Sequence, residues 1–233
     1  MYIFILIMIL ITTYYKSNNE NRNSEIDKCL LKNSENNYIE KIYLLNNQTY
    51  NLDFINNNKI VQIIINTGKD YKLKYNDAIK FINENLSNNI CILSNSDIYF
   101  DDTLSKITDS VINNKLFALL RYDEDINGNK KIFEWYNMAR NDTQDSWIFK
   151  SPLKVDLDKL NFSLGTLGCD SIFASILYDT GITITNPSYD IVTTHVHLSE
   201  HRSYNVDDRI HGKYCLVKPC NLYQNSVISL MDY

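Results

Sequence analysis

The sequence predicts an α/β fold with a mostly parallel central sheet and helices on the faces of that sheet. Short apolar runs rich in Ile, Leu and Val alternate with segments whose apolar residues recur at helical spacing. Parallel strands need long crossover connections, which helices usually supply. The chain has 233 residues, 44% of them hydrophobic, which is enough for one such domain around a large core.

The first expected strand covers residues 2–11, an uninterrupted apolar run. Such a run is typical of a central strand that is buried on both faces. A signal peptide or a membrane anchor is the alternative. The run is too short to span a bilayer, however, no Lys or Arg precedes it, and no small-residue cleavage site follows it. We therefore expect a buried strand and no stable membrane span.

The next elements follow the same rhythm. A helix is expected to begin at a cap on Asn23 or Ser24. Further strands are expected over residues 41–45, 59–65, 90–93 and 116–121. Two more helices are expected over residues 78–86 and 104–112. This order of strand, helix and strand is what predicts crossover connections and a parallel sheet.

From about residue 123 the pattern is less regular. The polar turn at Asn127-Gly128 predicts a hairpin, because this pair favours the tight turn that joins two antiparallel strands. Later elements are expected as strands over residues 147–149, 182–184 and 191–196 and a helix over residues 170–178. No internal repeat, linker or second domain boundary is visible, so one domain is expected.

Composition argues against two classes of function. The net charge is −5 and the basic residues are scattered, whereas nucleic-acid binding needs clustered Lys and Arg. The five cysteines are odd in number and lack C-x-x-C spacing, so neither a zinc site nor a disulfide framework is predicted. Reduced thiols are typical of a cytoplasmic protein.

The sharpest local signal is Asn95-Ser96-Asp97, which follows the apolar strand expected at residues 90–93. Ligands of open α/β sheets bind at the carboxyl ends of the strands. A carboxylate at such a position can hold a divalent cation, because these cations prefer oxygen ligands. Asp97 is therefore a candidate metal ligand. The alternative is that Asn95 and Asp97 only stabilise a turn.

A second group consists of His195, His197 and Arg202. Residues at positions i and i+2 of a strand share one face, so His195 and His197 are expected to point the same way. Neutral imidazoles can ligate Mn²⁺, and the guanidinium of Arg202 can bind phosphate through two hydrogen bonds. The alternative is a polar strand face with two solvated histidines.

A third group lies in residues 164–171, where two glycines precede Asp170 at a predicted helix start. Glycine lets the backbone turn tightly and approach a ligand closely. At this position Asp170 can accept a proton from an acceptor hydroxyl. The alternative is that Asp170 caps its own helix.

Taken together, these segments resemble GT-A glycosyltransferases of large DNA viruses, the chlorella viruses among them, and of some plants and microbes. The resemblance extends over residues 3–204. It rests on six segments in the same order: residues 11–26, 95–101 (NSDIYFD), 144–149 (QDSWIF), 168–171 (GCDS), 186–188 (NPS) and 195–197 (HVH). The combination is more specific than any one of these motifs.

The resemblance implies a hexosyltransferase that uses a UDP- or GDP-sugar and a Mn²⁺ or Mg²⁺ ion at a DxD-like motif. The sugar would pass, with inversion, to a hydroxyl of a glycan or glycoprotein. The single GT-A domain would span residues 1–233, with a donor-binding half (1–122), an acceptor-side and metal-binding half (123–204) and a C-terminal extension (205–233). It would be located in the cytoplasm, that of the host if the protein is viral.

The resemblance also implies which residues bind the donor. Thr13 and Tyr14 would line the base and ribose, and Arg22 would lie near the nucleotide or diphosphate. Further contacts with the donor are expected from Asn95, Ser96 and Arg202.

The same resemblance implies the residues of the chemical step. Asp97 would hold the metal together with His195 or His197. Asp170 would deprotonate the acceptor hydroxyl, and Asp145 is its main competitor for that role. A sugar ring would stack on Trp147 or Trp135, although each is also a candidate for the hydrophobic core.

The sequence departs from the family pattern at two places. Asn95 replaces one of the two carboxylates of the DxD motif, and Gly68-Lys69 stands where an Arg is expected. Two other functions remain as alternatives. One is a sugar-nucleotide pyrophosphorylase, against which the absence of glycine from residues 12–25 counts heavily. The other is a module that binds a nucleotide sugar or glycan without catalysis.

Overall fold

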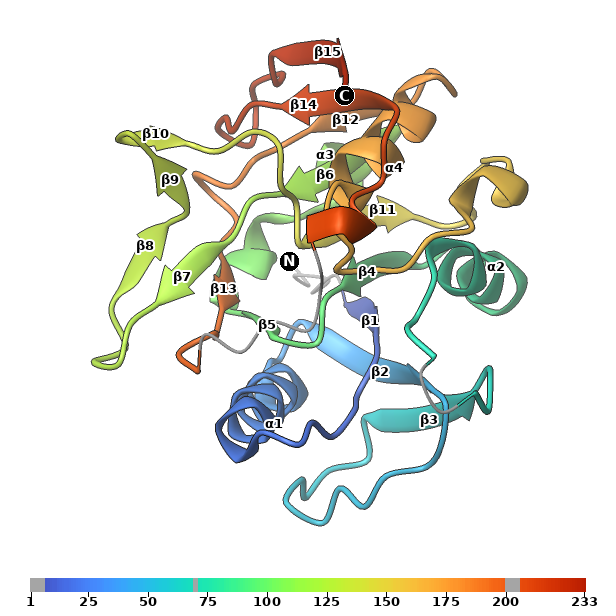
Figure 1. Cartoon of the computed structure of the whole chain (residues 1–233), viewed down its shortest axis with the longest axis vertical. Helices are drawn as coiled ribbons and strands as arrows, with labels where there is room; N and C mark the ends of the chain where they lie inside the picture. Colours follow the sequence, from blue (N-terminus) through green and yellow to red (C-terminus); the bar gives the residue numbers. More distant parts are fainter. Residues whose placement is uncertain (1–6, 69–70, 200–205) are drawn as a thin grey trace, which may run out of the picture.

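The computed structural model describes residues 7–68, 71–199 and 206–233. Its main feature is a seven-stranded sheet in the order β12-β6-β11-β4-β1-β2-β3 (Figure 1). The strands are β1 (Met8–Thr12), β2 (Ile39–Asn46), β3 (Ile60–Ile64), β4 (Ile90–Ser94), β6 (Lys115–Leu119), β11 (Ser146–Lys150) and β12 (Thr183–Thr185). Four neighbouring pairs are parallel, and β11 is antiparallel to both β4 and β6. The predicted α/β class with a mostly parallel sheet is confirmed.

Strand β1 lies between β2 and β4. Its side chains alternate between two cores: Met8 and Leu10 enter the hydrophobic cluster on one face of the sheet, Ile9 and Ile11 the cluster on the other. Burial on both faces explains why this segment is an unbroken apolar run. The predicted strand is confirmed from Met8 onward, and residues 1–6 lie outside the described part. None of the helices described is both long and apolar enough to span a membrane.

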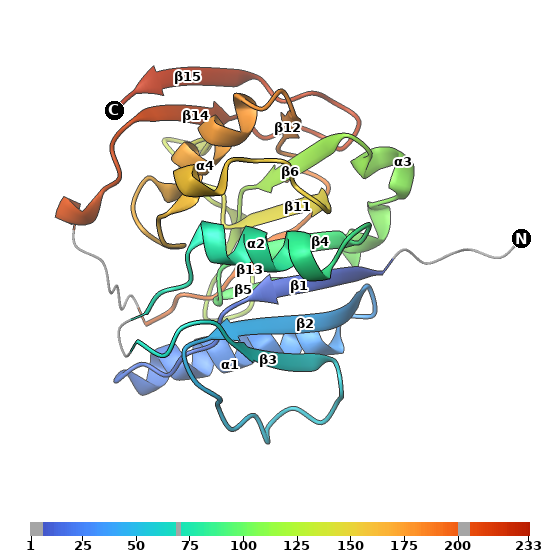
Figure 2. The ribbon, with the colours of Figure 1, turned by 90° about the vertical axis from the view of Figure 1, so that its right-hand side faces the viewer.

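Helices cover both faces of the central sheet (Figures 1 and 2). Helix α1 (Glu20–Glu35) contributes Ile26 and Leu30 to the core that contains Leu10. Helices α2 (Tyr75–Asn85) and α4 (Cys169–Tyr178) pack into the other core. The helices predicted from about residues 78 and 170 are confirmed as α2 and α4.

Helix α1 begins earlier than predicted. Its N-cap is Asn19, whose side chain accepts a hydrogen bond from the backbone N–H of Arg22 at 3.1 Å. Asn23, which we expected as the cap, lies in the first turn instead. Its side chain accepts a hydrogen bond from the N–H of Ser17 at 2.6 Å and donates one to the carbonyl of Ser17 at 3.0 Å. The segment contains several residues that favour N-caps, so composition alone did not select among them.

The single helix predicted over residues 104–112 is wrong, because this segment forms two short helices. The first is the 3₁₀ helix η1 (Asp102–Lys106) and the second is α3 (Asp109–Ile112). Asp101 caps η1 by accepting the N–H of Thr103 at 3.0 Å, and the backbone is extended at Ile107. Two separate helix starts therefore replace one continuous helix.

A smaller sheet stands beside the central one and has the order β5-β13-β7-β8. Its strands are β5 (Ile98–Phe100), β7 (Tyr122–Glu124), β8 (Lys130–Ile132) and β13 (Thr193–His195). Strands β7 and β8 form the hairpin predicted at Asn127-Gly128. A second hairpin follows, made of β9 (Glu134–Trp135) and β10 (Met138–Ala139). In Figure 1 strands β7 to β10 form an arm on the left of the molecule.

The last part of the chain forms an antiparallel pair, β14 (Lys213–Val217) and β15 (Ile228–Asp232), after the short 3₁₀ helix η3 (Val206–Asp208). Cys215 and Val217 belong to the same hydrophobic core as Phe173 of α4. Another short 3₁₀ helix, η2 (Leu157–Leu160), adds Leu160 to that core. The C-terminal segment is thus part of the packed domain.

Candidate active site

A cleft of about 850 Å³ opens at the carboxyl edge of the central sheet. The segments after β1 and β4 form part of its wall, and the loop before α4 forms another part. Thr13, Asp97 and Asp170 are among the residues that line it. The cleft therefore lies where ligands of such sheets bind, beyond the carboxyl ends of the strands.

Asp97, His195 and His197 meet at one end of this cleft. One potential ligand atom from each residue lies within 4.8 Å of the others. Strand pairing brings them together, because His195 lies opposite Ile98 and the N–H of Val196 donates to the carbonyl of Asp97 at 3.0 Å. The two imidazole rings are stacked, with centroids 5.4 Å apart, so the shared face predicted from their spacing is present.

Two atoms of this group are buried and have no hydrogen-bond partner among the described residues. They are Oδ1 of Asp97 and Nε2 of His197. Buried polar atoms without a partner are rare, because each loses its hydration without compensation. Mn²⁺ accepts carboxylate oxygen and imidazole nitrogen, which are the two kinds of atom left without a partner here. The residues present therefore fit a metal ion.

Arg22 of α1 closes this end of the cleft. Its guanidinium contacts Oδ2 of Asp97 at 2.5 Å, Oε2 of Glu25 at 3.0 Å and Nδ1 of His197 at 3.0 Å. Burial alone would raise the pKa of Asp97, but the charges of His195 and Arg22 outweigh burial and hold that pKa well below its usual range. Asp97 is therefore ionised at any ordinary pH.

His195 lies between two carboxylates. Its Nδ1 is 2.8 Å from Oδ1 of Asp123, and its Nε2 is 3.3 Å from Oδ2 of Asp97. The parallel pairing of β13 with β7 places Asp123 directly beside it. Burial disfavours the imidazolium, but Asp97 and Asp123 together raise the pKa of His195 to about 9. The contact with Asp123 orients the ring so that Nε2 faces Asp97. Both ring nitrogens carry protons in this state, so His195 would have to release the Nε2 proton before it could ligate a cation.

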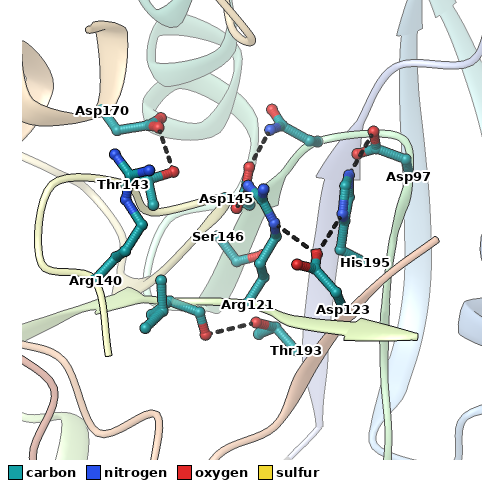
Figure 3. A network of polar contacts seen from close by, with 12 residues as sticks. Asp97, Arg121, Asp123, Arg140, Thr143, Asp145, Ser146, Asp170, Thr193 and His195 are labelled. Carbon is teal, nitrogen blue, oxygen red and sulfur yellow. Dashed lines mark hydrogen bonds and ion pairs between the residues drawn. The ribbon is translucent and has the colours of Figure 1, made fainter. Parts of the chain in front are cut away.

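Arg121 connects this end of the cleft with the other. Its Nε donates to Oδ1 of Asp123 at 3.0 Å, and its Nη1 donates to Oδ2 of Asp145 at 2.9 Å (Figure 3). Sequence reasoning did not identify Arg121 or Asp123 as site residues. The position of Arg121 could have identified it, because it is the last residue of the strand that we expected over residues 116–121 and ligands bind at strand ends.

Asp145 and Asp170, the two candidate bases, differ in their surroundings. Asp145 is held by Arg121 and by the side-chain amide of Asn95, which donates to Oδ1 at 3.0 Å. Asp170 accepts a hydrogen bond from the Tyr75 hydroxyl at 3.2 Å. Burial and the negative charge of Asp145 raise the pKa of Asp170 to about 7. Asp170 is thus the carboxylate that can exchange a proton near neutral pH.

Asp170 does not cap helix α4. The N-cap is Gly168, at φ +83°, and no side chain in the described part of the chain caps the helix. Glycine is required there because a Cβ atom would contact the Tyr214 hydroxyl and lie 2.9 Å from the carbonyl oxygen of Ile210. Asp170 stands at the second position of the helix and lines the cleft.

The residues expected to bind the donor have mixed outcomes. Thr13 and Ser96 line the cleft and are half-buried. Tyr14 also lines the cleft, although the residue is only 1% exposed and its hydroxyl donates to Asp27 at 2.6 Å. Tyr15, which sequence reasoning missed, is the half-buried aromatic neighbour on the cleft wall.

Two of the residues expected near the donor lie outside the described part, and the two tryptophans differ in burial. Arg202 and Lys69 lie outside the described part of the chain. Trp147 is 1% exposed and packs edge-on against Phe173 in the core, so it cannot stack on a sugar. Trp135 is 61% exposed.

No family model and no curated protein matches this sequence. Among solved structures, the chain is similar to S. aureus TarS 1–349 in complex with UDP-GlcNAc, with a TM-score of 0.51, 11% identity, and coverage of 89% of this chain and 62% of that one. A 4-diphosphocytidyl-2C-methyl-D-erythritol synthase from Anaerococcus prevotii DSM 20548 matches with a TM-score of 0.45, 12% identity and coverage of 87% and 94%. The likeness to TarS shows a shared fold, and the GT-A-like architecture expected from the sequence is thereby confirmed.

Proposed function

We propose that this chain is a metal-dependent glycosyltransferase that moves a sugar from a nucleotide-sugar donor to a hydroxyl of a glycan or glycoprotein. One observation carries the proposal: a single cleft contains both a set of residues that fits a divalent cation and a carboxylate with a pKa near 7. Asp97, His195 and His197 form the first, and Asp170 is the second. In its finer form the proposal is a hexosyltransferase that inverts the anomeric centre.

Asp97, His195 and His197 would hold a Mn²⁺ or Mg²⁺ ion, which would neutralise negative charge on the diphosphate leaving group. Arg209 also lines the cleft and adds positive charge there, whereas Lys16, another lining residue, is paired with Asp27 at 2.8 Å. The chain spans 62% of the TarS structure, which holds UDP-GlcNAc, and this supports UDP-sugars as the first donors to test, with GDP-sugars beside them.

Asp170 would act as the general base. Its ionised form takes the proton of the acceptor hydroxyl, and the hydroxyl oxygen bonds to the anomeric carbon of the donor sugar. The bond from that carbon to the diphosphate breaks on the opposite face, and the diphosphate leaves with the electron pair. The hydrogen bond from Tyr75 (3.2 Å) keeps the carboxylate in place. A base whose pKa lies near the working pH suits this step.

A thermal-shift screen of UDP, GDP and CDP, each with Mn²⁺ and with EDTA, tests the donor and metal. If one nucleoside diphosphate raises the melting temperature only when Mn²⁺ is present, the result supports the transferase and identifies the nucleobase of its donor. Incubation of the matching nucleotide sugars then tests turnover. Binding without any turnover of donor, to water or to saccharides, would favour a binding module. Formation of nucleotide sugar from nucleoside triphosphate and sugar phosphate would favour a pyrophosphorylase.

Asp170→Asn, compared with Asp145→Asn, tests the assignment of the base. Loss of a general base lowers turnover by ~10²–10⁴-fold and leaves donor affinity nearly unchanged. Loss of a sugar-binding carboxylate mainly raises KM. We expect the first pattern for Asp170→Asn and the second for Asp145→Asn. Normal turnover by Asp170→Asn would place the base elsewhere.

A further inference from the structure

The β9–β10 hairpin presents large side chains to solvent beside the cleft. Trp135 is 61% exposed, Tyr136 82% and Met138 69%. The rings of Trp135 and Tyr136 are stacked, with centroids 5.4 Å apart and 15° between their planes. The turn holds Tyr136 and Asn137 at φ values of 50° and 60°, a conformation that is unusual for a bulky residue. Exposed apolar side chains gathered in this way mark binding surfaces more often than isolated ones do.

The hairpin is connected to the cleft by an aromatic stack, formed by Tyr136, Trp135, Arg140 and Phe133. The guanidinium of Arg140 lies 5.4 Å from the Trp135 ring and 5.1 Å from the Phe133 ring. Both distances are within the range of a cation–π contact. Phe133 and Arg140 line the cleft. The surface thus continues from the exposed turn into the candidate active site.

The inner end of the aromatic stack is held rigidly. Arg140 contacts the carboxylate of Asp142 through two hydrogen bonds of 2.8 and 2.5 Å. The guanidinium of Arg121 lies 4.0 Å from the centre of the Phe133 ring and also donates a hydrogen bond to Asp145. In Figure 3 Arg140 lies on the side of Asp170, opposite Asp97 and His195. The aromatic stack therefore lies toward Asp170 and away from the candidate metal-binding residues Asp97 and His195.

We propose that the aromatic stack binds the acceptor as a neutral oligosaccharide, with sugar rings lying against the solvent-exposed parts of Trp135 and Tyr136 and the reacting end directed toward Asp170. Flat aromatic faces match the apolar C–H face of a pyranose ring. Charged groups beside them, such as Asp142 and Arg140, can exchange hydrogen bonds with sugar hydroxyls. This combination of ring faces with fixed polar groups suits a saccharide better than an apolar protein surface. The assignment of the saccharide as acceptor rests on the proposed transferase function.

The two tryptophans provide a direct test, because the chain contains one buried and one exposed. Protein labelled with 5-fluorotryptophan should give two ¹⁹F signals, and Trp135→Ala identifies the exposed one by its loss. Neutral tri- to pentasaccharides of the cello, manno and chito series are then added in EDTA without any nucleotide. We expect at least one series to shift the Trp135 signal and to leave the Trp147 signal unchanged.

The affinity of that saccharide should fall roughly tenfold or more in Tyr136→Ala, because aromatic anchors dominate binding surfaces of this kind. Tyr223→Ala is the matched control, since Tyr223 is 85% exposed and lies away from the cleft lining. No shift of the Trp135 signal with any series would overturn the proposal. So would a shift that depends on protein concentration alone, because the occupant would then be a second copy of the chain.

This test and the test of the transferase fail separately. A Trp135 signal that responds to saccharide, in a protein with no metal-dependent nucleotide binding, would keep the saccharide site and reject the transferase. In the opposite case nucleotide binding depends on Mn²⁺ and the Trp135 signal never responds. That result would reject the aromatic stack as the acceptor site and leave the transferase standing.

Discussion

At the scale of single residues, Arg121 links the two ends of the cleft through ion pairs with two carboxylates. The guanidinium is bound to Asp123 on the side of His195 and to Asp145 on the side of Asp170. Because a guanidinium is planar and always charged, it fixes both carboxylates at a set separation. Groups that would act on the donor and on the acceptor are thereby held by one side chain.

Asp123→Ala should weaken Mn²⁺ binding by roughly 10–100-fold, because a carboxylate that orients a metal-bound imidazole contributes that much in comparable sites. The physical reason is the 2.8 Å contact between Asp123 and Nδ1 of His195. Calorimetric titration with Mn²⁺ measures the effect. Asp109→Asn, at an exposed carboxylate far from the cleft lining, is the control. Unchanged affinity in Asp123→Ala would show that Asp123 does not position the ligand.

Asp145→Asn should move the acid limb of the kcat/KM profile to lower pH. In the proposed mechanism activity requires ionised Asp170, so it should rise with pH through the Asp170 pKa of about 7. The negative charge of Asp145 contributes to that raised pKa, and its removal stabilises the ionised form of Asp170. We expect a shift of roughly one pH unit. A limb that stays in place while the rate falls would mean that another group titrates.

The raised pKa of Asp170 also affects stability. Its protonated form is favoured in the folded state, so the stability that this proton provides is present below the unfolded pKa near 4 and is lost as pH rises through about 7. Asp170→Asn removes this dependence. The variant should therefore lose less stability than the parent protein between these two pH values, as measured by chemical denaturation.

Some residues of the candidate site could be predicted from their neighbours in the sequence, and others could not. Asp97 was predictable because it follows a strand end, and His195 and His197 because their spacing puts them on one face. Arg121 had only its place at a predicted strand end as a signal. Asp123 had none, since its contact with His195 joins residues 72 positions apart through pairing in the second sheet.

At the scale of elements, the loop before α4 depends on its two glycines in different ways. Gly165 and Gly168 both have positive φ, at 73° and 83°. A Cβ atom at Gly165 would meet nothing within 4 Å, whereas at Gly168 it would meet the Tyr214 hydroxyl and the carbonyl of Ile210. The close approach of β14 to the start of α4 therefore requires glycine only at Gly168.

Gly168→Ala should consequently destabilise the fold more than Gly165→Ala. The φ strain common to both variants costs about 1 kcal/mol, and the steric contact adds to it in Gly168→Ala only. Denaturant unfolding of the two variants measures the difference. Equal losses of stability would show that Tyr214 moves away without cost and that β14 does not pack tightly on this turn.

The long elements were predictable from the sequence and the short ones only in part. Strands β1 and β4 and helices α2 and α4 have a buried face on nearly every turn or pleat, so hydrophobic periodicity marks them. The antiparallel position of β11 between β4 and β6 was not visible, because pairing order depends on contacts distant in the chain. The hairpin β7–β8 was visible through its Asn127-Gly128 turn.

At the scale of the whole molecule, the central sheet separates two cores and its carboxyl edge carries the cleft. The candidate metal-binding set takes Asp97 from the segment after β4 and both histidines from the region around β13. The carboxylates and the aromatic stack lie toward the other side of the same cleft. We propose that the donor diphosphate binds at the first side and the acceptor at the second, so that the two substrates meet between them.

The most direct test of this account is calorimetry of UDP binding in Mn²⁺ and in EDTA, for the parent protein, Asp97→Asn and the control Asp109→Asn. If the thermal-shift screen favours GDP or CDP, that nucleoside diphosphate takes the place of UDP in this experiment. The account predicts that Mn²⁺ strengthens binding to the parent protein and to Asp109→Asn, and that Asp97→Asn loses this effect while remaining folded. Equal affinity of the parent protein in Mn²⁺ and EDTA, or a metal effect that survives in Asp97→Asn, would contradict it.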